Sequence, residues 1–86
     1  MKTLAELKNI LQVGTKLKTL ENNHGKYIGE TAEITKRQTN GIYINRNGKS
    51  SWLEFPKASQ VVFDGNDIFT FDIGFFKVKY QIIKGE

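Results

Sequence analysis

The feature that most constrains this chain is a series of turn sequences, rich in Asn, Asp and Gly, that divides residues 14–86 into short segments. Two of these turns, Asn40-Gly41 and Asn47-Gly48, lie between strand-like runs. Each Asn-Gly pair tolerates the two positive φ angles of a type I′ turn and therefore predicts a two-residue hairpin turn. The segments between turns alternate apolar and polar residues, as half-buried strands do. We therefore expect a mainly β fold.

The alternation also predicts which face of the sheet each side chain occupies. In the last segment, Val78 and Tyr80 are expected to face the core, so the lysines beside them face outward. The two Asn-Gly turns make residues 34–55 an expected three-stranded antiparallel meander. The expected strands are residues 15–21, 27–38, 42–46, 49–55, 60–63, 68–73 and 75–83.

A helix is expected before the strands, at residues 4–12. Thr3 and Glu6 have the spacing of a capping box, in which each side chain accepts a backbone N–H of the other. Three leucines recur on one face of this helix, namely Leu4, Leu7 and Leu11. A helix of about nine residues is marginal alone, so this leucine stripe must pack on something. The open end of the chain's own barrel is expected, and a partner or a second copy is the alternative.

The length of 86 residues fits a single domain, expected over residues 1–86. The chain contains no Cys, which excludes disulfides and thiolate–metal sites. No apolar run approaches the roughly 20 residues needed to span a bilayer, and the first residues lack an apolar signal core. We therefore expect a cytoplasmic protein that is not membrane-bound and is a monomer or a weak homodimer.

The sequence contains few residues that could take part in catalysis. The single histidine, His24, lies in a turn sequence, and a catalytic triad needs Ser, His and a carboxylate brought together by a larger scaffold. One His and scattered carboxylates do not supply the three or four ligands of a metal site at any diagnostic spacing. We therefore predict that the protein is not an enzyme, with no catalytic residues, no metal site and no cofactor.

The order of segments in residues 15–63 resembles an SH3-like barrel. These residues are expected to form a first strand, a long polar loop, two hairpin-linked strands, a fourth strand that carries Trp52, and a one-turn helix before a short last strand. Residues 13–18 and 25–36 are similar to the opening of KOW and Tudor-type modules. The resemblance implies a barrel over residues 15–63, with an extra C-terminal hairpin over residues 67–83.

The chain as a whole is also similar to short uncharacterised proteins of bacterial phages and mobile elements. The segment that carries this likeness is SWLEFPKA, residues 51–58. No established activity comes with it.

Positive charge and exposed aromatic residues are the strongest functional signal. The formal net charge is +4, which is compatible with an acidic partner. Two i, i+2 lysine pairs, in the first and last strands, can each present charge to successive phosphates. Further Lys and Arg lie near turns, beside aromatic residues that can stack on bases. The candidate nucleic-acid-binding residues are Lys16, Lys18, Lys26, Tyr27, Lys36, Arg37, Tyr43, Arg46, Lys49, Trp52, Lys57, Lys77 and Lys79.

Two functions follow from these features. The first is a non-enzymatic module that binds nucleic acid through a basic barrel face. The second is a protein-interaction module, such as a phage or mobile-element accessory or inhibitor protein, that uses the leucine stripe or the Trp52 face against a host protein. The simplest alternative to both is that the lysines are ordinary solvated residues and that Trp52 packs on the barrel. Steep loss of affinity with salt is expected only for phosphate binding.

Overall fold

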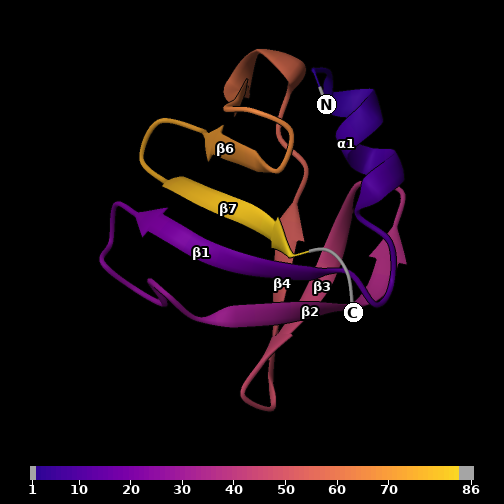
Figure 1. Ribbon diagram of the computed structural model, residues 1–86, viewed down its shortest axis with the longest axis vertical. Helices are drawn as coiled ribbons and strands as arrows, with labels where there is room; N and C mark the ends of the chain where they lie inside the picture. The colour runs from indigo at the N-terminus through magenta and orange to yellow at the C-terminus, as the bar shows by residue number, and fades with distance from the viewer. Residues whose placement is uncertain (1, 84–86) are drawn as a thin grey trace.

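The computed structural model describes residues 2–83, and Figure 1 shows a short N-terminal helix followed by a curled sheet. The seven strands form one antiparallel sheet in the order β4-β3-β2-β1-β7-β6-β5, which confirms the expected mainly β fold with an N-terminal helix. The elements are α1 (Leu4–Ile10), β1 (Lys16–Asn22), β2 (Thr31–Gln38), β3 (Gly41–Arg46), β4 (Lys49–Glu54), the one-turn helix η1 (Ala58–Gln60), β5 (Val61–Phe63), β6 (Ile68–Asp72) and β7 (Lys77–Ile83).

The sheet is not closed into a barrel, which corrects the SH3-like barrel expected over residues 15–63. A barrel would need its last strand to pair with β1 or β4. Strand β5 pairs only with β6 among the described strands, because β7 occupies the free edge of β1 along its whole length. The hairpin of β6 and β7 therefore lies inside the sheet and is no appendage to it, and β4 and β5 remain the two edges.

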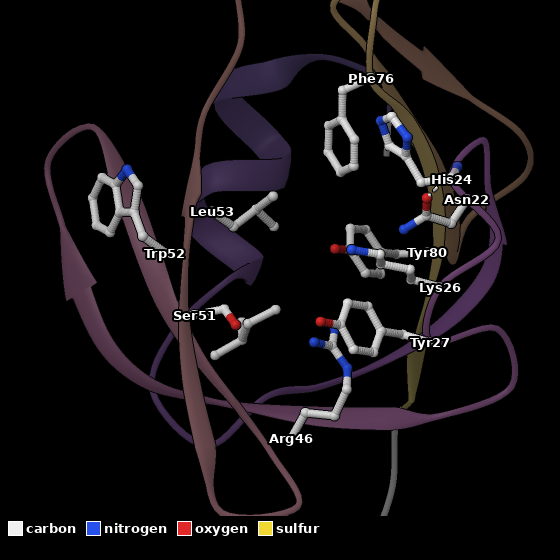
Figure 2. A pocket seen from close by; sticks show the side chains of 11 residues that line it. Asn22, His24, Lys26, Tyr27, Arg46, Ser51, Trp52, Leu53, Phe76 and Tyr80 are labelled. Carbon is white, nitrogen blue, oxygen red and sulfur yellow. Dashed lines mark hydrogen bonds between the residues drawn. The ribbon is translucent and has the colours of Figure 1, made fainter.

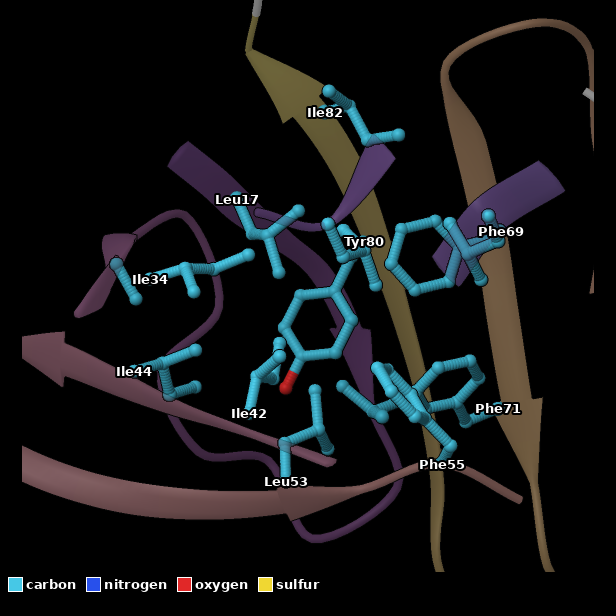
Figure 3. Close-up of a cluster of buried hydrophobic side chains, with 14 residues drawn as sticks. Leu17, Ile34, Ile42, Ile44, Leu53, Phe55, Phe69, Phe71, Tyr80 and Ile82 are labelled. Carbon is cyan, nitrogen blue, oxygen red and sulfur yellow. The ribbon is translucent and has the colours of Figure 1, made fainter. Parts of the chain in front are cut away.

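The sheet curls so that β3 and β4 cross behind β1 and β7, and the enclosed space holds the core (Figure 1). Figure 3 shows Phe69, Phe71 and Tyr80, which come from the neighbouring strands β6 and β7, in one cluster with Ile42 of β3 and Leu53 of β4. Leu7 and Leu11 are both 0% exposed and belong to the same cluster. The leucine stripe thus packs within the chain.

Helix α1 begins as the sequence predicts and ends earlier. The Glu6 backbone N–H donates to the Thr3 hydroxyl at 3.2 Å, and the Thr3 N–H donates to the Glu6 carboxylate at 3.1 Å, which completes the capping box. The helix ends at Ile10, not at residue 12, and the Gly14 N–H donates to the carbonyl of Ile34 in β2 at 2.8 Å. That bond ties the end of the helical segment to the sheet.

One of the two predicted Asn-Gly turns is confirmed and the other is wrong. Asn47 and Gly48 have φ angles of 55° and 84°, as a type I′ turn requires. The turn between β2 and β3 instead uses Thr39 and Asn40, because Gln38 is paired with Gly41. Gly41 is therefore the first residue of β3, and its φ is not positive.

Two β-bulges change the faces that simple alternation assigns. In the β2–β3 pair the register shifts between Ile34 and Lys36, so that Lys36 lies opposite Tyr43. In the β1–β7 pair it shifts between Thr19 and Glu21, so that Glu21 lies opposite Lys79. A bulge adds one residue to one strand, and every later side chain on that strand moves to the other face. The bulges therefore decide which charges meet on the outer face, which is the side of the sheet turned away from the core.

Candidate nucleic-acid interface and pocket

A row of one cation and two aromatic rings crosses the outer face of β2, β3 and β4. Lys36, Tyr43 and Trp52 lie directly opposite one another in the register. The two ring centroids are 4.9 Å apart at an interplanar angle of 56°, and the Lys36 Nζ lies 5.9 Å from the Tyr43 ring centroid. Trp52 is 40% exposed, so it is an outer-face residue and not a core residue. We call Lys36, Tyr43 and Trp52 the aromatic row.

The absence of a side chain at Gly41 makes room for this row. A Cβ added to Gly41 would lie 2.5 Å from two atoms of the Trp52 indole and 2.7 Å from the Leu53 carbonyl oxygen. The indole therefore lies against the backbone of β3, and any larger residue at position 41 would displace it.

The four lysines of the paired strands share the β1–β7 part of the outer face, but they are not equivalent. Strands β1 and β7 are neighbours, as joint action of these lysines requires. The Lys79 Nζ lies 3.5 Å from an Asp64 carboxylate oxygen and 3.9 Å from a Glu21 carboxylate oxygen. Carboxylates also stand opposite two others, since Lys16 pairs with Glu33 and Lys77 pairs with Asp72. This part of the outer face therefore carries mixed charge.

Three other candidates lie apart from the aromatic row. Arg37 turns inward after the β2 bulge, where its guanidinium carbon lies 4.8 Å from the Phe55 ring centroid and its side chain donates to the carbonyls of Lys8 and Gln38. Arg37 thus joins the sheet to α1 and is not a surface cation. Lys49 is exposed at the start of β4, and Lys57 is exposed just before η1.

The remaining candidates, Lys26, Tyr27 and Arg46, line a pocket of about 360 Å³ (Figure 2). The pocket lies between the loop after β1 and the strands β3, β4 and β7. Figure 2 shows the Trp52 ring on the far side of β4 from Tyr27 and Arg46, so the pocket and the aromatic row face different sides of β4 and share only Trp52. The other lining residues are Asn22, His24, Ile44, Ser51, Leu53, Phe76 and Tyr80, with Trp52 at the margin.

Arg46 is the buried charge of this pocket. It is 6% exposed, and its guanidinium carbon lies 4.1 Å from the Tyr27 ring centroid. Its Nε is buried and has no hydrogen-bond partner in the part of the chain that the structure describes. Burial raises the pKa of the Tyr80 phenol above 10.0, and the positive charge of Arg46 partly opposes that rise. Tyr80 therefore stays neutral beside the guanidinium at ordinary pH.

The loop after β1 is fixed by bonds to β7 and by an unusual backbone angle. The Asn23 side chain donates to the Phe75 carbonyl at 3.0 Å and accepts the Lys77 N–H at 3.1 Å. Tyr27 has a φ of 63°, a left-handed conformation that bulky residues rarely adopt. The Glu30 N–H donates to the Tyr27 carbonyl at 3.0 Å, which helps to hold this conformation.

Sequence reasoning missed most of the pocket. Alternation along the last strand correctly assigned Tyr80 to the core side, and composition assigned His24 to a turn, where its ring stacks on Phe76 at a centroid distance of 5.9 Å. Neither pattern indicates that these residues meet Arg46, because the pocket combines three segments that only the curl of the sheet brings together.

No protein-family model, curated protein or solved structure matches this chain. Among residues 2–83, no helix is long and apolar enough to cross a membrane. Over the same residues, no group of three or more His, Cys, Asp or Glu side chains is placed to hold a metal ion.

Proposed function

We propose that this chain is a non-enzymatic module that binds single-stranded nucleic acid on the outer face of β1 to β4, with little sequence preference. The aromatic row is the observation that carries the proposal. Exposed rings beside lysines are the elements with which sequence-tolerant single-strand binders stack bases and contact phosphates. Trp52 and Tyr43 would stack on bases, and Lys36 would contact a phosphate on the Tyr43 side of the row.

The phosphate contacts are assigned by charge environment. Lys36 stands opposite an aromatic residue, whereas Lys79 already faces two carboxylates. Lys18 extends the same outer face onto β1, where Thr31 and Gln81 stand opposite it, whereas Lys16 stands opposite Glu33. Lys49 lies on the pocket side of β4, beside Tyr27 and Arg46. Phosphate binding on the outer face is therefore expected to depend on Lys18 and Lys36 more than on the lysines of β7.

The alternative function is a protein-interaction module, such as a phage or mobile-element accessory or inhibitor protein. Of the two surfaces expected for it, the leucine stripe and the Trp52 face, only the Trp52 face is exposed. Leu7 and Leu11 are buried in the core, so the leucine stripe is not available to a host protein. The Trp52 face would serve either function. Salt dependence separates the two, because aromatic anchors in a protein interface respond to salt much less than phosphate contacts do.

Trp52→Ala should weaken binding of labelled single-stranded oligonucleotides by about 5- to 150-fold, since base–aromatic stacking contributes roughly 1–3 kcal/mol per base. Fluorescence anisotropy at about 50 mM salt measures the affinity, and a thermal melt of the same variant separates lost stacking from lost folding. If the wild-type protein binds no tighter than roughly 10⁻⁴ M, which is the weak end of ordinary non-specific affinity, the nucleic-acid proposal is wrong and the protein-interaction module is favoured.

Lys36→Ala should reduce the slope of log affinity against log salt by about 0.7, the value for one phosphate contact on a single strand. Lys79→Ala is the matched control, because it removes the same charge from a site where two carboxylates already surround it. Titrations between about 50 and 200 mM salt give both slopes. Equal changes for the two variants would mean that net charge, and not the aromatic row, governs binding.

A further inference from the structure

We infer that the pocket around Arg46 binds a small carboxylate carried on a flat or apolar body. The inference goes beyond the proposed function. The residues that carry it, Arg46 and Tyr27, lie on the other side of β4 from the Trp52 ring (Figure 2).

The first support is an uncompensated buried charge. Arg46 is 6% exposed, yet no Asp or Glu among residues 2–83 lines this pocket. Buried charges in proteins are normally paired, because removing an ion from water is costly unless another charge offsets that cost. The neighbouring hollow, which shares Tyr27 and Arg46, contains Glu30, whose carboxylate accepts from the Asn47 side chain at 3.3 Å and forms no ion pair with Arg46 among the described residues. Arg46 is thus a cation whose counter-charge a ligand can provide.

The second support is the way in which Tyr27 leaves the guanidinium available. The Tyr27 ring covers one face of the guanidinium at 4.1 Å, which is a cation–π contact. The N–H groups of a guanidinium point outward in its plane, where they match the two oxygens of a carboxylate. Stacking and carboxylate binding therefore use different parts of Arg46. The Nε has no hydrogen-bond partner among the described residues, and the Tyr80 hydroxyl interacts with the same guanidinium, so the chain satisfies these donors only in part.

The third support is the composition of the wall, which favours a carboxylate over a phosphate. One buried guanidinium balances a single negative charge, and the other pocket cation, Lys26, is exposed to solvent. Leu53, Phe76 and Tyr80 supply apolar and aromatic surface for the body of the ligand. A volume of about 360 Å³ accommodates one small molecule or one residue at the end of a peptide. Both sources present the same carboxylate chemistry.

The test compares a carboxylate with its neutral isostere. Indole-3-acetate and indole-3-acetamide are titrated separately into the ¹⁵N-labelled full chain, and backbone amide shifts are followed. The acetate should shift the amides of Tyr27, Arg46 and Ser51. The acetamide should bind about 10- to 150-fold more weakly, because a hydrogen bond to a charged group is worth about 1.5–3 kcal/mol. Equal binding of the two compounds, or no acetate binding up to roughly 10 mM, would overturn the inference.

Further probes identify the source of the carboxylate and check the alternative anion. A short acetylated peptide ending in Trp, with a free or an amidated C-terminus, is compared with indole-3-acetate. Tighter binding of the free-acid peptide assigns the pocket to peptide termini, and tighter binding of the acetate assigns it to a free small molecule. Inorganic phosphate that competes with indole-3-acetate on equal terms would contradict the preference for a carboxylate.

Two variants test whether Arg46 and Tyr27 are responsible for the binding of indole-3-acetate. Arg46→Met should abolish the preference for acetate over acetamide, and an apolar residue of similar length is often tolerated in place of a buried charge. Tyr27→Gly is the second variant, because glycine readily adopts the positive φ at this position and the change removes only the stacking ring. It should weaken acetate binding about 2- to 30-fold. Lys57→Gln, a charge removal outside the pocket, should leave binding unchanged.

Failure of this inference and failure of the proposed function are distinguishable. The carboxylate titrations contain no nucleic acid, and the oligonucleotide titrations depend on the aromatic row. Loss of the acetate response in Arg46→Met, together with unchanged oligonucleotide affinity, would establish two independent sites.

Discussion

Leu7→Ala should lower the free energy of unfolding by about 2–5 kcal/mol, the usual cost of removing a buried leucine side chain from a packed site. Leu7 is 0% exposed and packs in the central cluster from the only α-helix among the described elements. A domain of this length has roughly 4–13 kcal/mol of stability in total, so the change removes a large share of it. Urea unfolding followed by circular dichroism measures the effect.

Ile10→Ala is the matched control for Leu7→Ala. Ile10 occupies the last turn of the same helix and is 36% exposed, so its truncation should cost clearly less. Equal effects of the two variants would mean that helix propensity, and not burial, explains the loss. A Leu7→Ala variant that keeps its stability but loses self-association or partner binding would contradict intramolecular docking of α1.

Gly41→Ala should also destabilise the protein, by about 1–3 kcal/mol, which is the range for overpacking a tight site. The new Cβ would lie 2.5 Å from the Trp52 indole and 2.7 Å from a backbone carbonyl oxygen. The side chain can move away, but the Leu53 carbonyl is part of the β3–β4 ladder and cannot move without disturbing the strand pair. Thermal melts and urea unfolding measure the loss.

A double-mutant cycle separates this crowding from backbone strain. Trp52→Ala removes one of the two clashes, so its effect should be non-additive with Gly41→Ala by more than about 0.5 kcal/mol. Gly48→Ala is the comparison, because its site is open and its cost of about 1–2 kcal/mol comes from the positive φ alone. Its effect should add to that of Trp52→Ala. Additivity at both glycines would disprove the contact between Gly41 and Trp52.

Local sequence patterns were sufficient to predict most of the secondary structure. Alternation placed Val78, Tyr80 and Ile82 correctly in the core, and the Asn47-Gly48 pair correctly predicted its turn. These signals succeed because a period of two residues and a positive φ angle depend only on neighbouring residues. The turn predicted at Asn40-Gly41 was wrong because Gly41 does not serve a turn. A glycine is needed at this position because the Trp52 indole on β4, outside the turn, leaves no room for a side chain.

The candidate interface could be predicted only in part. The thirteen candidate residues included all three members of the aromatic row, but nothing in their spacing distinguished Lys36 from Arg37. The bulge in β2 turns Lys36 outward and Arg37 inward, and the bulge in β1 gives Lys79 its Glu21 partner. A bulge depends on how two strands fit together, so alternation within one strand cannot reveal it.

The sequence by itself determined a β-rich chain with a capped N-terminal helix, an apolar core face on each main strand and an excess of positive charge. The tertiary structure alone decided that β7 pairs with β1, which leaves the sheet open where a barrel was expected. It also decided that Arg46 is buried against Tyr27, although the two residues are separated in the sequence by the whole of β2. Strand order and pocket walls are set by contacts between distant segments, and those contacts form only when the sheet curls around its core.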